Sequence, residues 1–248
     1  DLALTTGAAI TDDGTVTVLA NLTATTNDND GAITLGTLAV TGTVGVTTNG
    51  GGNATLVNAS GLNFAASNVG GALDATATLG TLIDTGAITV AGVSAFTTSA
   101  QDANILLDST NALTGAVTLT TATAGGNTGD ASINNGTTAL AIDTSTISGD
   151  LALTTGAAIT DDGTVTVAAN LTATTNAGGA AIDLGTLAVA GTVGVTTDGS
   201  GNATLVNADG LNFAVSDVGG DLAATATLND IIDTGALTVA GASVLTTV

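Results

Sequence analysis

The stretch DLALTTGAAITDDGTVTV at Asp1–Val18 occurs again, letter for letter, at Asp150–Val167. Within it apolar residues alternate with small or polar ones, so that Leu2 and Leu4 flank Ala3. Alternation with a period of two is typical of a strand that buries one face. This stretch therefore predicts short half-buried β-strands joined by tight turns.

The repeat extends far beyond these eighteen residues. When residue i is aligned with residue i+149, 77 of 99 comparable positions are identical. Substitutions keep the character of the site, as when Leu82 becomes Ile231 and Asn68 becomes Asp217. We therefore divide the chain into a first copy, residues 1–149, and a shortened second copy, residues 150–248, and expect one continuous solenoid that is part of a longer protein.

A shorter period lies inside each copy. Strand-like pieces end in paired threonines at Thr6, Thr26 and Thr48, with spacings of 20 and 22 residues. A recurring unit of about twenty residues is too short to bury its own apolar face, so successive units must stack.

Turn residues separate the strand-like pieces. Clusters of Gly, Asn and Asp occur at Asp12 to Gly14, Asn27 to Gly31, Asn49 to Asn53 and Gly125 to Gly129. These residue types tolerate positive φ and hydrogen-bond to nearby backbone, which sharp corners require.

These observations predict an all-β chain that folds as a right-handed parallel β-helix, or β-solenoid, with coils of about 20 residues. The main alternative is a set of antiparallel β-sandwich repeats, although such cores usually hold Trp or Tyr, which the chain lacks. A third candidate is the square solenoid of pentapeptide repeats, suggested by the five-residue spacing of Asn53, Asn58, Asn63 and Asn68.

Composition excludes several functions. The chain has no Lys, Arg or His, and its net charge is −21, all of it from Asp. Binding to nucleic acid or to an anionic membrane surface requires cationic side chains, so neither is expected as a partner. No apolar run reaches the roughly 20 residues of a membrane-spanning helix, so direct membrane insertion is not expected.

The sequence also argues against catalysis. Without His, Cys, Lys, Tyr or Glu, Asp is the only candidate acid or base. The adjacent pairs Asp12/Asp13 and Asp161/Asp162 suit corners of a turn better than a catalytic dyad. We therefore expect a protein that is not an enzyme and has no catalytic residues.

Calcium is the one cofactor that the sequence suggests. Asn27, Asp28, Asn29 and Asp30 precede Gly31 and place several oxygen ligands in one turn, as a hard cation prefers. The second copy, Asn176 to Ala180, lacks both carboxylates, so a solvated polar turn is the other interpretation of this segment. No further cofactor is expected.

Three segments resemble a known group of proteins. GAITVAGVSAFTT at Gly86–Thr98, GALTVAGASVLTT at Gly235–Thr247 and GDLALTTGAAI at Gly149–Ile159 are similar to the strand repeats of filamentous-haemagglutinin-like adhesins and autotransporter passenger domains of bacteria. The resemblance implies a right-handed β-helical shaft exported to the cell exterior, which holds adhesive tips away from the surface or forms a fibrous coat. Shafts of that group contain scattered Lys, Arg and aromatic residues, and this chain departs from them.

The functional expectation is a structural or adhesive shaft, or a self-assembling filament segment, of a secreted bacterial surface protein. Its expected partners are other copies of itself and a host or neighbouring-cell surface, and its expected location is extracellular. The alternative is a calcium- or carbohydrate-binding surface module, and an Asp-based glycosidase ranks third.

Overall fold

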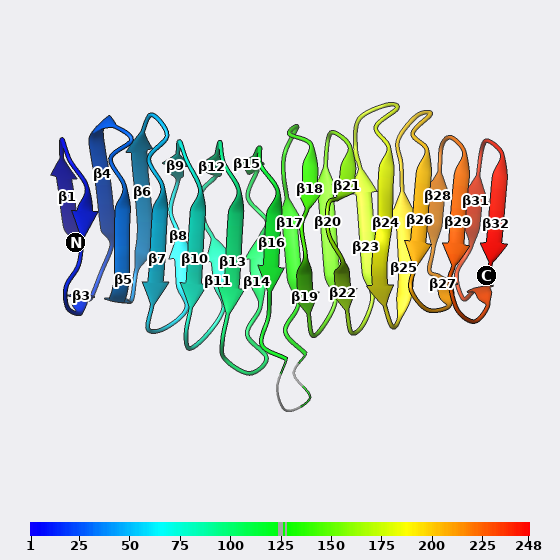
Figure 1. Cartoon of the computed structure of the whole chain (residues 1–248), viewed down its shortest axis with the longest axis horizontal. Helices are drawn as coiled ribbons and strands as arrows, with labels where there is room; N and C mark the ends of the chain where they lie inside the picture. The colour runs from blue at the N-terminus through cyan, green and yellow to red at the C-terminus, as the bar shows by residue number, and fades with distance from the viewer. Residues whose placement is uncertain (124–125, 127) are drawn as a thin grey trace.

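The computed structural model describes residues 1–123, 126 and 128–248. The described residues contain strands, turns and no helix. They wind into an elongated β-solenoid of about 12 coils, one coil every ~21 residues, with the two termini at opposite ends (Figure 1). The predicted parallel β-solenoid is confirmed, and its right-handed sense stays a prediction.

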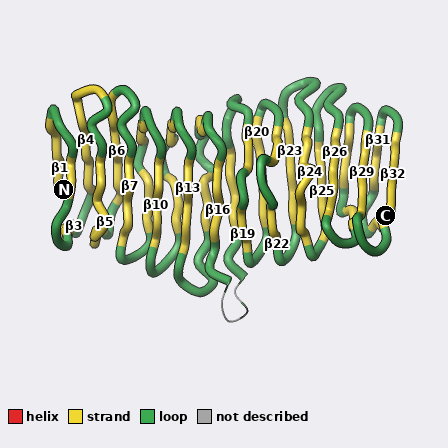
Figure 2. Tube along the Cα trace, in the orientation of Figure 1, coloured by secondary structure: helices red, strands yellow, loops and turns green. Residues whose placement is uncertain are grey.

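Each coil passes once through each of two sheets, and turns join the sheets at the upper and lower edges of the view in Figure 2. The first sheet consists of β1 (Leu2–Thr6), β4 (Leu22–Asn29), β6 (Thr43–Asn49), β8 (Leu62–Phe64), β9 (Ser67–Val69), β11 (Leu82–Asp84), β12 (Ile88–Val90), β14 (Ile105–Leu107), β15 (Ala112–Leu113), β17 (Ala131–Asn134), β20 (Leu151–Thr155), β23 (Leu171–Thr175), β25 (Thr192–Thr196), β27 (Leu211–Phe213), β28 (Ser216–Val218), β30 (Ile231–Asp233) and β31 (Leu237–Val239). The second sheet consists of β2 (Ile10–Thr11), β3 (Val16–Val18), β5 (Ile33–Val40), β7 (Ala54–Asn58), β10 (Leu73–Ala77), β13 (Ser94–Thr98), β16 (Val117–Thr120), β18 (Leu140–Ile142), β19 (Ser145–Ile147), β21 (Ile159–Asp161), β22 (Val165–Val167), β24 (Ile182–Val189), β26 (Ala203–Asn207), β29 (Leu222–Ala226) and β32 (Ser243–Thr247).

Successive coils pair in parallel and in a register that places like on like. Leu2 lies opposite Leu22, and Leu151 lies opposite Leu171. The two copies join without interruption, because β17 pairs with β20 and β19 pairs with β22. Antiparallel sandwich repeats would have produced hairpin pairs, whereas the strand pairs of the described residues are parallel.

The core is a narrow column of aliphatic side chains between the sheets. The three phenylalanines are all buried, and Phe64 and Phe96 meet edge to face with ring centroids 6.4 Å apart. Edge-to-face contact is a favoured geometry for two aromatic rings. The column is thus filled mainly by Leu, Ile, Val and Ala, as its narrow cross-section requires.

The paired threonines mark places where the chain leaves a sheet. The second Thr of a pair points inward and closes the turn: Thr26 Oγ1 donates to the Gly31 carbonyl at 2.8 Å, and Thr48 Oγ1 donates to that of Gly52 at 2.7 Å. Thr175 Oγ1 donates in the same way to the Ala180 carbonyl at 3.1 Å. A buried hydroxyl needs a partner, and the carbonyl of the following turn supplies it at each of these Thr residues.

Asn and Asp at the lower edge connect one coil to the next. The Asp1 carboxylate accepts the Asn21 amide at 3.0 Å, and the Asn21 side-chain oxygen accepts the Thr43 amide at 2.9 Å. Asp150 and Asn170 repeat this in the second copy. These side chains therefore cap the backbone of the following coil as well as shaping their own turn.

The spaced asparagines have unlike environments. Asn58 is buried, whereas Asn53 and Asn68 are exposed, so the series does not form one inner face of a square solenoid. The turn expected at Gly125 to Gly129 falls partly on residues 125 and 127, outside the described residues. Within the described ranges, no helix has the length and apolar character needed to cross a membrane.

One buried asparagine gives a test of the coil-to-coil bonding. Asn58 accepts the Val40 amide at 2.9 Å and donates to the carbonyls of Val40 and Gly61. Asn58→Ala leaves these groups without partners, so we expect the free energy of unfolding to fall by about 1–3 kcal/mol.

Chemical denaturation measures this loss, and Asn68→Asp, which the second copy already carries, is the matched control. Equal stability of the two variants would contradict the assigned role of Asn58.

Candidate functional site

Surface hollows recur along the lower edge, where the second sheet turns into the first. Two of them are lined by residues of the second sheet and of the turns next to it, and have volumes of about 290 and 260 Å³. We call them the sheet hollows. Their linings are identical in the two copies, comprising Thr15, Gly36, Thr37, Leu38, Val57, Ala59 and Thr78 in the first, and Thr164, Gly185, Thr186, Leu187, Val206, Ala208 and Thr227 in the second.

A β-bulge in the long strand of each copy contributes to the sheet hollow. The pairing of β5 with β7 shifts register between Leu35 and Leu38, which leaves Gly36 and Thr37 outside the ladder. The Asp12 carboxylate binds this bulge, accepting the amides of Gly36 at 2.9 Å and Thr37 at 2.8 Å and the Thr37 hydroxyl at 3.0 Å.

The second copy builds the same bulge in β24, with Asp161 bound to Gly185 and Thr186. In the two adjacent carboxylate pairs of the sequence, Asp12 and Asp161 therefore each bind a bulge of the next coil. Their neighbours Asp13 and Asp162 are exposed.

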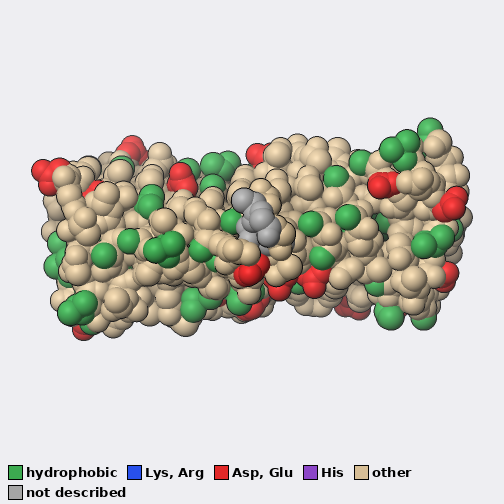
Figure 3. Space-filling model, turned by 90° about the horizontal axis from the view of Figure 1, so that it is seen from below, with side chains coloured by type: hydrophobic (Ala, Val, Ile, Leu, Met, Phe, Trp, Pro, Cys, Tyr) green, Lys and Arg blue, Asp and Glu red, His purple; other side chains and the backbone are tan. Residues whose placement is uncertain are grey.

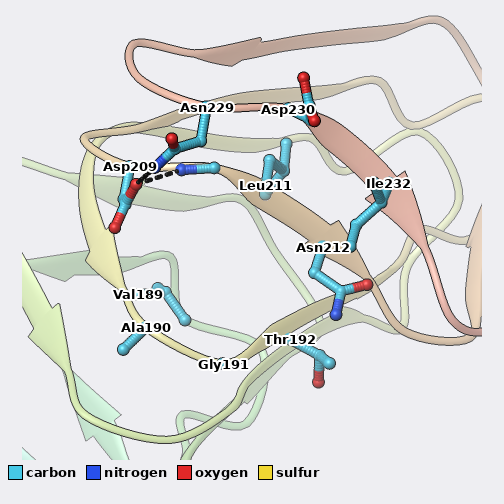
Figure 4. A pocket seen from close by; sticks show the side chains of 11 residues that line it. Val189, Ala190, Gly191, Thr192, Asp209, Leu211, Asn212, Asn229, Asp230 and Ile232 are labelled. Atoms are coloured by element: carbon cyan, nitrogen blue, oxygen red, sulfur yellow. Dashed lines mark hydrogen bonds between the residues drawn. The ribbon is translucent and has the colours of Figure 1, made fainter.

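Two further hollows lie on the other side of the same turns and are called the corner hollows. The hollow of the second copy has a volume of about 400 Å³ and that of the first about 240 Å³. Here the copies differ, since Asp209 and Asp230 line the second copy in place of Ser60 and Thr81. In Figure 4 Asp209 is hydrogen-bonded to the Asn229 amide on one side, with Asn212 and Ile232 on the other.

In each copy an exposed leucine lies, along the chain, between a residue of the sheet hollow and residues of the corner hollow. Leu79 is 69% exposed and Leu228 is 61% exposed. Each directly follows the Thr that lines the sheet hollow and precedes residues of the corner hollow. Figure 3 views this edge and shows hydrophobic side chains distributed along it with acidic groups among them. The edge thus combines apolar recesses, protruding leucines and carboxylates.

The predicted calcium ligands lie at the opposite edge of the solenoid. Asn27, Asp28 and Asn29 end β4, Asp30 begins the turn, and all four side chains are exposed. The Asp30 carboxylate accepts the Gly51 amide of the next coil at 2.6 Å. Among the described residues no group of three or more His, Cys, Asp or Glu side chains is placed to hold a metal ion. Calcium binding by this turn stays a prediction.

The sequence interpretation missed the hollows. Ser60 of the first copy aligns with Asp209 of the second, and Thr81 aligns with Asp230. The gain of carboxylates in the second copy at Asp209 and Asp230 was the available signal, but only the stacking of coils shows that both line one hollow.

This fold defines a repeat protein of the parallel β-solenoid class. A family described as repeats of unknown function, DUF5649, matches residues 51–120, 128–196 and 200–248. The chain belongs to this family. No curated protein and no solved structure matched the chain.

The three matches follow one another along the chain, and each is at most about half as long as the 149-residue repeat. The long repeat therefore contains a shorter family unit.

Protonation of Asp12 should weaken the bulge. Burial acts to raise the pKa of the Asp12 carboxyl, but hydrogen bonds from Gly36 and Thr37 outweigh it and hold the pKa below the ordinary value of 3.8. A lowered folded-state pKa stabilises the protein above the unfolded value, and this stability is lost as pH falls through the folded value. Asp12→Ala should therefore destabilise the protein at neutral pH and cost progressively less below pH 3.8.

Denaturation curves at several pH values measure this difference, with Asp13→Ala as the control for removing one carboxylate. A destabilisation by Asp12→Ala that is the same at pH 7 and at about pH 2 would contradict the assignment.

Calcium binding can be tested by exchanging one turn for its counterpart. Replacing Asp28, Asn29 and Asp30 by Ala, Gly and Gly copies the second-copy turn. If Asn27–Asp30 is a defined site, calorimetry of the parent protein should show stoichiometric calcium binding that the exchange abolishes. Weak heat without stoichiometry in both proteins would overturn the site.

Proposed function

We propose that the chain is a segment of a non-catalytic shaft in a secreted bacterial surface protein, serving as a structural or adhesive filament outside the cell. The observation that carries the proposal is the unbroken parallel pairing of coils from β1 to β32. About 12 coils at the ~4.8 Å spacing of paired strands give a rod roughly 55–60 Å long.

The hydrogen-bonding pattern supports a mechanical role. Main-chain bonds between coils run along the rod axis, so at each coil boundary a pull on the ends is shared by the bonds of both sheets. Side chains reinforce them at the corners, as Asn21 does with Thr43. A rod of this kind resists extension without needing a large core.

The resemblance of Gly86–Thr98 and Gly235–Thr247 to adhesin repeats supports export and a role at the surface. The chain contains none of the His, Cys, Lys or Glu side chains that usually carry acid, base or nucleophilic chemistry. The proposal accordingly contains no catalytic step.

Coil stacking also supports assembly. Phe96 of β13 is fully buried because β10 pairs with its strand on one side and β16 pairs on the other. A coil therefore needs a neighbour on each face, supplied by the same chain or by another copy. Strand edges of this kind readily pair with further strands.

The rod and its assembly are tested together by small-angle scattering and electron microscopy of the segment. We expect rods about 55–60 Å long that extend end to end as concentration rises. Leu245→Asp places a charge on the exposed coil face and should suppress extension, while Val215→Asp, at a position 73% exposed away from that face, should not. Isolated globular particles at high concentration would contradict the proposal.

A further inference from the structure

We propose that the lower edge binds a basic polypeptide segment, with aliphatic side chains of the partner in the sheet hollows and its Lys or Arg side chains on the carboxylates beside them. This inference rests on the proposed shaft, since it needs a rigid rod to hold two such sites at a fixed separation.

The volume and lining of the sheet hollows favour a side chain as the occupant. Leu38, Val57 and Ala59 supply an apolar surface in the first copy, and the same residue types supply it in the second. Volumes of about 260–290 Å³ fall just below the roughly 300–1,000 Å³ usual for small-molecule sites. An extended segment that inserts one aliphatic side chain per hollow suits this size, and Leu79 and Leu228 enlarge the apolar contact.

Charge complementarity decides the chemistry of the partner. The chain carries −21 and has no cationic side chain, so an acidic partner, including a second copy, is repelled at this edge. Asp13 and Asp162 are exposed at the turns whose neighbours Thr15 and Thr164 line the sheet hollows. A segment with Lys or Arg beside its aliphatic residues gains from both features.

The two copies offer this partner sites of unequal strength. Their sheet hollows are lined alike, but only the second copy has Asp209 and Asp230 in the adjoining corner hollow, where the first has Ser60 and Thr81. More carboxylate near one site should strengthen the binding of a cation there. The second-copy site is therefore the tighter of the two.

The repeat sets the spacing of the sites. Equivalent residues of the two sites lie 149 positions apart, or about seven coils of ~21 residues. At ~4.8 Å per coil this is roughly 34 Å along one edge. An extended chain covers roughly 3.3 Å per residue, so a basic segment of about ten residues reaches from one site to the other. Simultaneous engagement of both sites raises the overall affinity without new contacts.

The test uses the full chain and a soluble peptide of repeated Lys-Leu-Gly units. Two control peptides replace Leu by Ser or Lys by Glu. Methyl NMR signals of Val57 and Val206, one in each sheet hollow, report on the two sites separately. We expect both signals to shift with the Lys-Leu peptide, Val206 at the lower concentration, and the affinity to fall about tenfold between low and physiological salt.

Variants taken from the chain itself serve as matched controls for folding. Asp209→Ser with Asp230→Thr gives the second copy the residues of the first, and should weaken binding at Val206 about three- to tenfold while leaving Val57 unchanged. Ser60→Asp with Thr81→Asp should strengthen binding at Val57 by a similar factor. Leu228→Ser should weaken the Val206 site without altering its salt dependence.

Several results would overturn the inference. The inference is wrong if the Lys-Leu peptide does not bind, or if the Glu peptide binds equally well. It is also wrong if the carboxylate exchanges leave the peptide affinities unchanged. Concentration-dependent self-association that Leu79→Ser and Leu228→Ser abolish would identify a second copy as the occupant instead. Scattering from the same samples separates the proposals, because a rod that fails to bind the peptide overturns this inference alone, whereas a compact particle overturns the shaft as well.

Discussion

Main-chain hydrogen bonding between successive coils is the constraint on which the structure depends. It fixes the spacing of the coils and brings their turns into close contact. At the upper edge a side chain at Gly70 would place its Cβ 1.7 Å from the Gly50 carbonyl oxygen, and Gly219 meets Gly199 in the same way at 1.9 Å. Glycine at these positions lets one turn lie directly on the turn before it.

The same constraint explains how a chain of −21 charge folds without a single Lys or Arg. Core positions are apolar, and carboxylates lie at turns or on outer faces, where water and ions screen their repulsion. Several carboxylates also accept backbone amides of the following coil, as Asp12 and Asp150 do. Among buried side-chain polar atoms of the described residues, Ser94 Oγ alone lacks a hydrogen-bond partner.

Repetition of the same turn shapes the surface of the lower edge. Stacking the same turn on itself produces hollows at equivalent places in both copies, and substitution then changes their chemistry without changing the rod. The sheet hollows keep their lining, while the corner hollow of the second copy gains Asp209 and Asp230. A solenoid of this type can vary the chemistry of its edge from one repeat to the next with little loss of stability, because the turns lie outside the core.

The sequence by itself determined the strands and the turns, because alternation such as Leu2-Ala3-Leu4 and the Thr pairs report local burial and chain reversal directly. It favoured the parallel solenoid over the antiparallel sandwich through the short period and the lack of Trp and Tyr. The sequence also shows that the chain has no cationic side chains. Only the tertiary structure decided which turns meet, that Asp12 holds the bulge at Gly36, and that Asp209 and Asp230 line one hollow. Those contacts join residues about twenty or more positions apart, and their pairing follows from coil lengths that vary with each turn, which local sequence patterns do not encode.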